Sequence, residues 1–203
     1  SSAASDVYKR QGYTPESLKS FALTVGISKR ENVIDVSLLE FCVRAHLNEE
    51  APRAMAVLDP LKISIINYNE NKEESVNFDI NPQKPGQGKR EVLFSKNIYI
   101  EREDFQENPE EGFFRLSLGE EVRLKNAYII KAKNIIKNKK GQITEVECEY
   151  DEKSKSGSNT EESNRKVKAT IHWVSAETAV EATINIYDRL FKVAEPGKSQ
   201  DLL

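Results

Sequence analysis

The sequence predicts a mainly β protein with a small α-helical part near its N-terminal side. Between residues 14 and 47 apolar residues recur every three or four positions, the period of a helix. From Leu61 onward the period is two, and turn residues interrupt the pattern every few positions. Many short strands without intervening helices indicate an antiparallel barrel or sandwich, and a closed barrel is favoured because it leaves no exposed edge.

Two helices are expected first. Thr14-Pro15-Glu16 is a helix start, with a hydroxyl cap, a proline and an acid near the positive helix end, and Gly26 stops this helix. The second helix begins at Asp35 or Ser37. Helices this short need a further surface to pack on. Their apolar faces comprise Leu18, Phe21, Ala22 and Val25, then Val36, Leu39, Cys42, Val43 and Leu47.

Strands follow, separated by turn signals such as Asn81-Pro82, Asn108-Pro109 and Lys140-Gly141. Beyond the strand that starts at Leu61, they are expected at residues 76–80, 92–94, 98–100, 113–118, 122–133, 143–150, 167–173 and 183–187. In 113–118 we expect Leu116 and Leu118 to face the core and Ser117 to face away. Residues 151–164 hold no apolar side chain, which predicts a mobile hairpin loop.

Composition narrows the function. With 30 basic and 33 acidic residues among 203, the net charge of -3 excludes a polycation but not RNA binding through a local patch. Cys42 and Cys148 have no metal-like spacing and are expected to be reduced thiols of a cytoplasmic protein. No apolar run approaches 18 residues and no signal peptide opens the chain, so no membrane association is expected.

Catalytic signatures are missing from the sequence. The basic, glycine-rich stretch 86–90 lacks the phosphate-loop spacing, and no dinucleotide fingerprint follows a strand. His46 and His172 share no metal-ligand spacing; we expect the first to be an exposed helix residue and the second a hydrogen-bonding residue at a strand end. No nucleophile elbow occurs.

Positive charge is concentrated in one region. Residues 113–140 carry eight basic side chains against Glu120 and Glu121. In a strand Arg123 and Lys125 would point away from Val122 and Leu124, so the cations would share a face beside aromatic residues. Such a face suits single-stranded RNA, although lysines on a solvated strand also protect a barrel from edge pairing.

Three segments and one motif together carry a family resemblance. They are residues 51–60, 171–176 and 187–191, and the motif that runs from Arg115 to Asn126. In this order they resemble the C-terminal, anticodon-binding region of glutaminyl-tRNA synthetase, a class I aminoacyl-tRNA synthetase, over residues 12–203. The resemblance implies two antiparallel β-barrels of the ribosomal-barrel-like anticodon-binding domain, of which the proximal barrel is incomplete.

The resemblance also implies boundaries. Residues 1–11 do not match the family and are expected to be a leader of other origin. A helical subdomain spans 12–52. Residues 53–60 with 172–203 form the truncated proximal barrel, and 61–171 form the distal barrel with its mobile loop.

By the same resemblance, anticodon contacts fall on Arg53, Arg115, Arg123 and Lys125 and on the loop Asn81, Pro82, Gln83 and Lys84. Lys125 stands where the family has an arginine, so it keeps charge but loses the planar fork. Without the resemblance, Arg53 would equally suit an interdomain salt bridge, and the loop would be a proline-stiffened turn. Contacts to the tRNA elbow or backbone would come from Ser28, Lys29, Arg30, Asn32 and Asn48, where a simple charged turn is the alternative.

The function implied is recognition of a glutamine tRNA within a glutamine–tRNA ligase. The intact enzyme would use ATP and Mg²⁺; this stretch lacks the two class I signatures, so we expect no cofactor and no catalysis in it. We expect a monomer. The alternatives are the eukaryotic or archaeal type of glutamyl-tRNA synthetase, a free-standing barrel that binds rRNA, and a β-sandwich hydrolase.

Overall fold

The computed structural model describes residues 11–30, 32–70, 72, 74–186, 188 and 193. The chain forms two compact units. The first comprises residues 1–52, 81–87 and 185–203; the second comprises residues 53–80 and 88–184. Except for Gln11, the predicted leader lies outside the described residues, as do all residues but Asp188 of the segment 187–191 that carries the resemblance.

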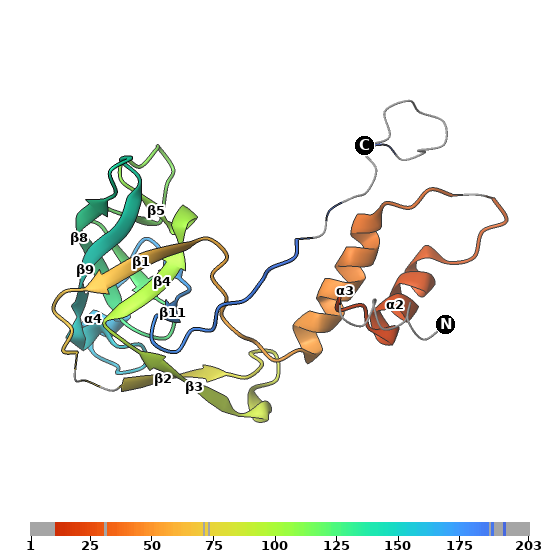
Figure 1. Ribbon diagram of the computed structural model, residues 1–203. Coiled ribbons are helices and arrows are strands. Elements are labelled where there is room, and N and C mark those ends of the chain that lie inside the picture. The colour runs from red at the N-terminus through yellow and green to blue at the C-terminus, as the bar shows by residue number, and fades with distance from the viewer. Residues whose placement is uncertain are drawn as a thin grey trace. The chain divides into compact units, whose positions relative to one another are not determined.

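Both predicted helices are confirmed (Figure 1). Helix α2 (Pro15–Val25) is capped by Thr14, whose hydroxyl accepts from the Ser17 amide at 3.1 Å, and it ends at Gly26, which has a φ of 71°. Helix α3 (Val36–Glu50) begins after Asp35, whose Oδ1 accepts from the Ser37 amide at 2.8 Å. The prediction for His46 is wrong, because its half-buried ring lies 3.0 Å from Thr14 Oγ1 and joins the two helices.

The second unit is a curled seven-stranded sheet with two small two-stranded sheets (Figure 1). In the large sheet the order is β10-β7-β8-β9-β1-β4-β11. Its strands are β1 (Pro60–Ile65), β4 (Asn97–Glu101), β7 (Glu121–Leu124), β8 (Ile129–Lys137), β9 (Ile143–Asp151), β10 (Thr170–Ile171) and β11 (Val174–Ser175). The small sheets pair β2 (Glu74–Asp79) with β3 (Lys89–Phe94) and β5 (Phe105–Gln106) with β6 (Leu116–Ser117). Three 3-10 turns, η1 (Pro85–Gln87), η2 (Arg102–Asp104) and η3 (Glu152–Ser154), complete the elements with α4 (Glu161–Asn164).

The sheet is mixed, which corrects the purely antiparallel expectation. Strand β1 pairs with β9 in parallel, and β10 with β7 likewise, while β8–β9 and β1–β4 are antiparallel. The two edge strands β10 and β11 are separated in the chain by His172 and Trp173 alone. One short segment therefore pairs with both ends of the curled sheet.

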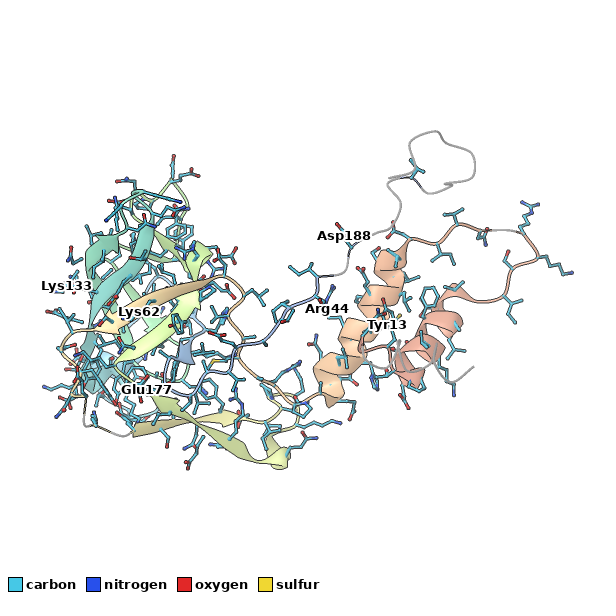
Figure 2. All side chains as sticks on the ribbon, in the orientation of Figure 1. Tyr13, Arg44, Lys62, Lys133, Glu177 and Asp188 are labelled. Carbon is cyan, nitrogen blue, oxygen red and sulfur yellow. The ribbon has the colours of Figure 1, made fainter. Side chains whose placement is uncertain are left out.

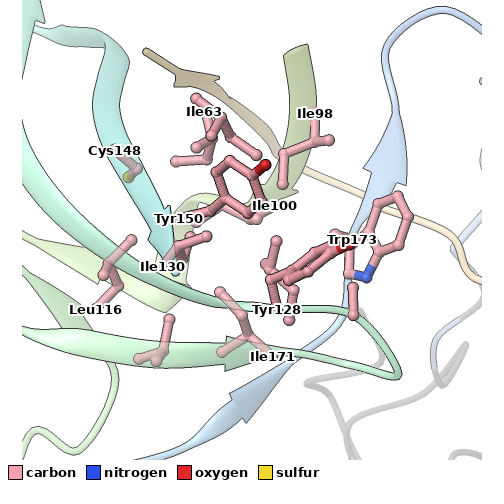
Figure 3. Packing of buried hydrophobic residues seen from close by; sticks show 14 of the residues in the cluster. Ile63, Ile98, Ile100, Leu116, Tyr128, Ile130, Cys148, Tyr150, Ile171 and Trp173 are labelled. Atoms are coloured by element: carbon pink, nitrogen blue, oxygen red, sulfur yellow. The ribbon is translucent and has the colours of Figure 1, made fainter. Parts of the chain in front are cut away.

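The core of the second unit lies inside the curve (Figure 3). Trp173 is fully buried, its ring meets Phe94 edge-on at 5.2 Å, and its Nε1 donates to the Lys125 carbonyl at 3.0 Å. Tyr128 and Tyr150 also pack edge-to-face, at 5.0 Å. Apolar burial around these rings holds the sheet together. The aliphatic residues packed beside them include Ile63, Ile98, Ile100, Leu116, Ile130 and Ile171.

Three strand predictions were wrong in detail. The expected strand at 113–118 shrinks to β6, where Leu116 is buried as predicted, but Ser117 is buried too and Leu118 is 48% exposed. Residues 122–133 form two strands, because Asn126 adopts a φ of 58° and turns the chain. Residues 183–186, the described part of the expected last strand, have no regular structure.

Residues 151–164 are structured, against the prediction of a mobile loop without secondary structure. They form η3 and α4, and Ser154 is fully buried, where its hydroxyl accepts from the Ile129 amide at 2.8 Å. Thr160 caps α4 and donates to the Lys153 carbonyl at 2.6 Å. Polar side chains bonded to backbone groups thus order a segment that has little apolar surface to bury.

Both cysteines are free and buried. Burial raises the pKa of the Cys148 thiol to about 12, so this thiol stays protonated and unreactive near neutral pH. Within the described part of the chain no helix is long and apolar enough to cross a membrane.

Candidate nucleic-acid interface

Arg115 lies directly before β6 and forms an ion pair with Asp104. The pairing of β5 with β6 sets this contact, because Phe105 is in register with Leu116 and the two charged residues immediately precede them. The Asp104 side chain is 1% exposed and that of Arg115 is 49% exposed. Burial raises the pKa of the Asp104 carboxyl, and the Arg115 guanidinium opposes this only in part. Arg115 is therefore anchored at one edge while about half of it faces solvent.

Arg123, on β7, holds segment 151–164 in place. Its Nη1 donates to the Ser154 carbonyl at 2.9 Å, and its Nη2 donates to the Ser163 carbonyl at 2.8 Å. Burial lowers the pKa of Arg123, and nearby Arg165 lowers it further. In this arrangement the guanidinium organises the protein's own backbone, so a direct contact with RNA would require exchange of these hydrogen bonds.

Lys125 occupies the turn that links β7 to β8. Its amide donates to the Ile171 carbonyl at 2.9 Å, and its own carbonyl accepts from Trp173. Its side chain is exposed. The next residue, Asn126, donates from Nδ2 to the Asn77 carbonyl at 2.9 Å. The amide and the carbonyl of Lys125 are thus both hydrogen-bonded, and its ammonium group is exposed at one end of β7.

Arg53 belongs to the same unit as these three residues. Its amide donates to the Ile80 carbonyl at 2.7 Å, which fixes its backbone beside the end of β2. Its side chain is half-buried.

The loop Asn81–Lys84 belongs to the helical unit. Asn81 is fully buried; its Nδ2 donates to the Glu49 carbonyl at 2.6 Å and its Oδ1 accepts from the Gln83 amide at 2.9 Å. Lys84 Nζ lies 2.5 Å from Glu50 Oε1, and this hydrogen bond lowers the pKa of Glu50. Carbonyls at a helix C-terminus lack partners within the helix. The loop is therefore fastened to the end of α3, and it leaves Pro82 and Gln83 exposed.

The elbow candidates lie on two parts of the helical unit. Ser28, Lys29, Arg30 and Asn32 form the exposed connection between α2 and α3, in which the Ser28 hydroxyl accepts from the Arg30 amide at 3.1 Å. Asn48 is exposed on α3, far along the chain from that connection.

The local positive charge is partly neutralised in space. Lys133 lies 2.7 Å from Glu149 and Lys137 lies 2.6 Å from Glu107. These acids belong to β9 and to a neighbouring loop, so they are not included when charges are counted within residues 113–140. Figure 2 shows Lys62 and Lys133 on strands of the sheet, and Lys62 also has an acidic neighbour, Glu145, at 3.1 Å. Among the described residues 113–140, the basic side chains without a salt bridge are Arg123, Lys125, Lys131, Lys139 and Lys140.

Two residues of this region were missed by sequence reasoning. Aromatic residues were expected beside the cations; Tyr128, Tyr150 and Trp173 are buried, whereas Phe114, directly before Arg115, is 66% exposed. Asp104 was missed because nothing in a run of acids marks the one that is buried. Within the described residues no cluster of three His, Cys, Asp or Glu could hold a metal ion.

Comparison with known proteins places this region in a family. Two models described as "tRNA synthetases class I (E and Q), anti-codon binding domain" match residues 51–151 and 170–203. The chain is 50% identical over 193 residues to "Glutamine--tRNA ligase" of Rhodopirellula baltica, covering 95% of this chain and 32% of that protein. The proteins of the same name from Aliivibrio fischeri and Tolumonas auensis are 49% and 47% identical, over 95% and 96% of this chain and 35% of each relative.

The chain thus spans about a third of the length of the curated relatives it matches. The first family match spans strands β1 to β9, and the second begins at β10. The chain belongs to the anticodon-binding domain family of the class I tRNA synthetases for glutamate and glutamine.

Proposed function

We propose that this chain is the anticodon-reading region of a glutamine–tRNA ligase and that its partner is glutamine tRNA. The observation that carries the proposal is near 50% identity, along almost the whole chain, to proteins named "Glutamine--tRNA ligase". The family description covers glutamate and glutamine enzymes alike. The choice of glutamine as the amino acid therefore rests on the names of these relatives. The mechanism is recognition: unstacked anticodon bases are held by stacking and hydrogen bonds, and cations contact phosphates.

The proposed architecture is two barrels. Pairing of β10 with β7, and of the following strand β11 with β4, supports a nearly closed distal barrel of residues 61–171 whose last edge strand comes from the next few residues. Residues 53–60 and 172–203 would contribute to an incomplete proximal barrel, with 12–52 as the helical subdomain.

The residues proposed to read the anticodon are Arg53, Arg115 and Lys125, with exposed Pro82 and Gln83. Half-exposed Arg115 and exposed Lys125 have charged groups open to solvent. Asn81 and Lys84 would shape the loop through their bonds to α3, and Arg123 would hold the adjoining segment and reach RNA only by exchanging carbonyl partners. Exposed Ser28, Lys29, Arg30, Asn32 and Asn48 are proposed for the tRNA backbone.

The whole ligase would join glutamine to its tRNA with ATP and Mg²⁺. We assign both to parts of the ligase outside the matched region, since no phosphate-binding loop occurs in the sequence and no metal-binding cluster occurs among the described residues. The ligase is proposed to be a cytoplasmic monomer. This region would contribute affinity and discrimination to the reaction.

A competition titration tests the proposal. Labelled glutamine tRNA is displaced from the protein by glutamine tRNA, by glutamate tRNA and by glutamine tRNAs with altered anticodons. We expect the glutamine tRNA to compete best, by about tenfold for each changed base that an arginine reads. The logarithm of affinity should fall with the logarithm of salt concentration by about 0.7 per phosphate contact.

Two variants separate base reading from charge. Arg115→Ala should reduce the preference among anticodons, whereas Lys139→Ala, which removes a cation without a salt bridge in the described structure, should lower affinity for all RNAs alike. Equal competition by every tRNA would overturn anticodon reading. A preference for glutamate tRNA would retain it and reassign the amino acid.

A further inference from the structure

We propose that Asp104 is a positioning residue for RNA recognition: it holds the guanidinium of Arg115 in the orientation that meets the anticodon. This inference rests on the proposed function and deepens it. The juxtaposition that carries it is a carboxylate with 1% of its side chain exposed, paired with an arginine that is 49% exposed.

The first step of the argument is the rigidity of the carboxylate. Asp104 ends η2 and precedes β5, so its backbone is fixed by the turn on one side and by the β5–β6 pairing on the other. Arg115 stands at the matching position before β6. Two strands in register therefore set the distance between the residues, and the contact is part of the sheet rather than a chance surface pair.

The second step concerns the donors of the guanidinium. One terminal nitrogen, Nη1, donates to Asp104 Oδ1. Among the described residues the Arg115 side chain makes no other hydrogen bond, so the remaining N–H groups of its guanidinium are open. When a carboxylate holds one edge of a planar guanidinium, the other edge can meet a base or phosphate in only one orientation. A ligand would then meet an arginine already ordered, and binding would lose less side-chain entropy.

The third step is that packing alone does not explain why position 104 is an aspartate. Asp104 Oδ2 is buried and has no hydrogen-bond partner among the described groups. An unsatisfied buried carboxylate oxygen is unfavourable for stability. An asparagine at position 104 would occupy the same space and could still accept a hydrogen bond from Arg115. It would lack the negative charge that attracts the guanidinium.

A double-mutant cycle tests the proposal with Asp104→Asn, Arg115→Ala and the double variant. The readout is the ratio of dissociation constants for a glutamine tRNA with an altered anticodon and for unaltered glutamine tRNA. This ratio is insensitive to a fraction of unfolded protein, and thermal melts report folding separately. We expect Asp104→Asn to lower the ratio by about fivefold or more, and to have no further effect once Arg115 is alanine.

The double variant also keeps the test independent of folding. Arg115→Ala leaves a buried carboxylate without its cation, so it should melt below the wild type, and adding Asp104→Asn should recover part of that loss. Glu149→Gln, which breaks the surface pair with Lys133, is the matched control and should leave the ratio unchanged.

The outcomes are distinguishable. If Arg115→Ala lowers the ratio and Asp104→Asn leaves it unchanged or raises it, Asp104 does not position the arginine and this inference is overturned, while anticodon reading stands. If Arg115→Ala itself leaves the ratio unchanged, the proposed role of Arg115 fails, and the inference with it.

Discussion

At the residue scale, Glu74 links the start of β2 to two parts of the second unit that are distant in the chain. The Tyr128 hydroxyl donates to its Oε1 at 2.6 Å, Lys72 Nζ lies 3.1 Å from its Oε2, and Lys155 completes the group. The Lys72 ammonium also lies 5.5–5.9 Å from the ring centres of Tyr68, Tyr128 and Tyr150. The Glu74 side chain is 12% exposed, so its charge is largely removed from water and compensated by these partners.

Replacing Glu74 with glutamine should destabilise the protein at neutral pH by about 2 kcal/mol, because two ammonium groups lose a largely buried anion. Burial raises the pKa of Glu74, but hydrogen bonds from Lys155, Tyr128 and Lys72 outweigh it and leave the pKa below 4.5. A carboxyl with a lowered folded-state pKa stabilises above its ordinary pKa and loses that effect as the pH falls through the lowered value.

The free energies of unfolding of wild type and Glu74→Gln should therefore differ most at neutral pH and converge as the pH falls through the lowered pKa of Glu74. Urea melts at several pH values measure this. Glu149→Gln is the control, since its pair with Lys133 is roughly half exposed and should contribute less than about 1 kcal/mol. If the difference in unfolding free energy between wild type and Glu74→Gln grew on acidification, Glu74 would not stabilise the protein as an anion.

Partners such as these mark a limit of sequence reasoning at the residue scale. The family resemblance identified Arg115 as a functional candidate, but its partner is one acid among Glu103, Asp104, Glu107 and others nearby in the chain. Burial selects Asp104, and burial depends on the tertiary fold. Counting along the chain likewise gave a basic region that Glu149 and Glu107 partly neutralise.

At the scale of elements, locally encoded features were predictable. Thr14, Asp35 and Gly26 fixed the helix ends because a cap acts within a few residues. The break at Asn126 was missed because asparagine in the left-handed region depends on its hydrogen bond to Asn77, a residue on β2. Segment 151–164 was missed because its order comes from serine and threonine bonds to backbone groups and from Arg123.

Arg123→Lys should loosen that segment while the sheet stays folded. A lysine keeps the charge but cannot reach the Ser154 and Ser163 carbonyls together, so amides of η3 and α4 should exchange with solvent at least about tenfold faster. Hydrogen exchange resolved by peptide measures this. Lys125→Arg, a change at an exposed position two residues away, should leave the segment unchanged. Uniform loss of protection across β8 and β9 would mean that Arg123 supports the sheet instead.

At the scale of the whole molecule, the alternation of apolar residues predicted a β-rich fold but not the order of its strands. Strand β1 lies beside β9 because the sheet curls, and that parallel pairing joins residues some eighty positions apart. Alternation is the same for parallel and antiparallel neighbours of a half-buried strand. The mixed sheet was therefore outside what the pattern could decide, although the resemblance to a barrel family anticipated its curvature.

The two compact units should differ in stability. The second unit buries a continuous cluster that contains Trp173 and Phe94 at 0% exposure. Among described residues of α2 and α3, only Ser17, Cys42 and Val43 are buried, while Leu23 and Phe41 are 74% and 62% exposed. Helices of this length gain most of their stability from tertiary burial. Little burial thus predicts frequent local opening of the helical unit.

Hydrogen exchange on the intact protein tests this difference. Amides in the middle of α3 should exchange at least about a hundredfold faster than those of β8 and β9, which are paired with strands on both sides. Thr14→Ala, which removes the cap of α2 and the contact with His46, should speed exchange in both helices and leave the sheet unaffected. If α3 exchanged as slowly as β8, burial would not be what sets the stability of each unit, and the capping hydrogen bonds would have to contribute far more than their usual 1 kcal/mol or so.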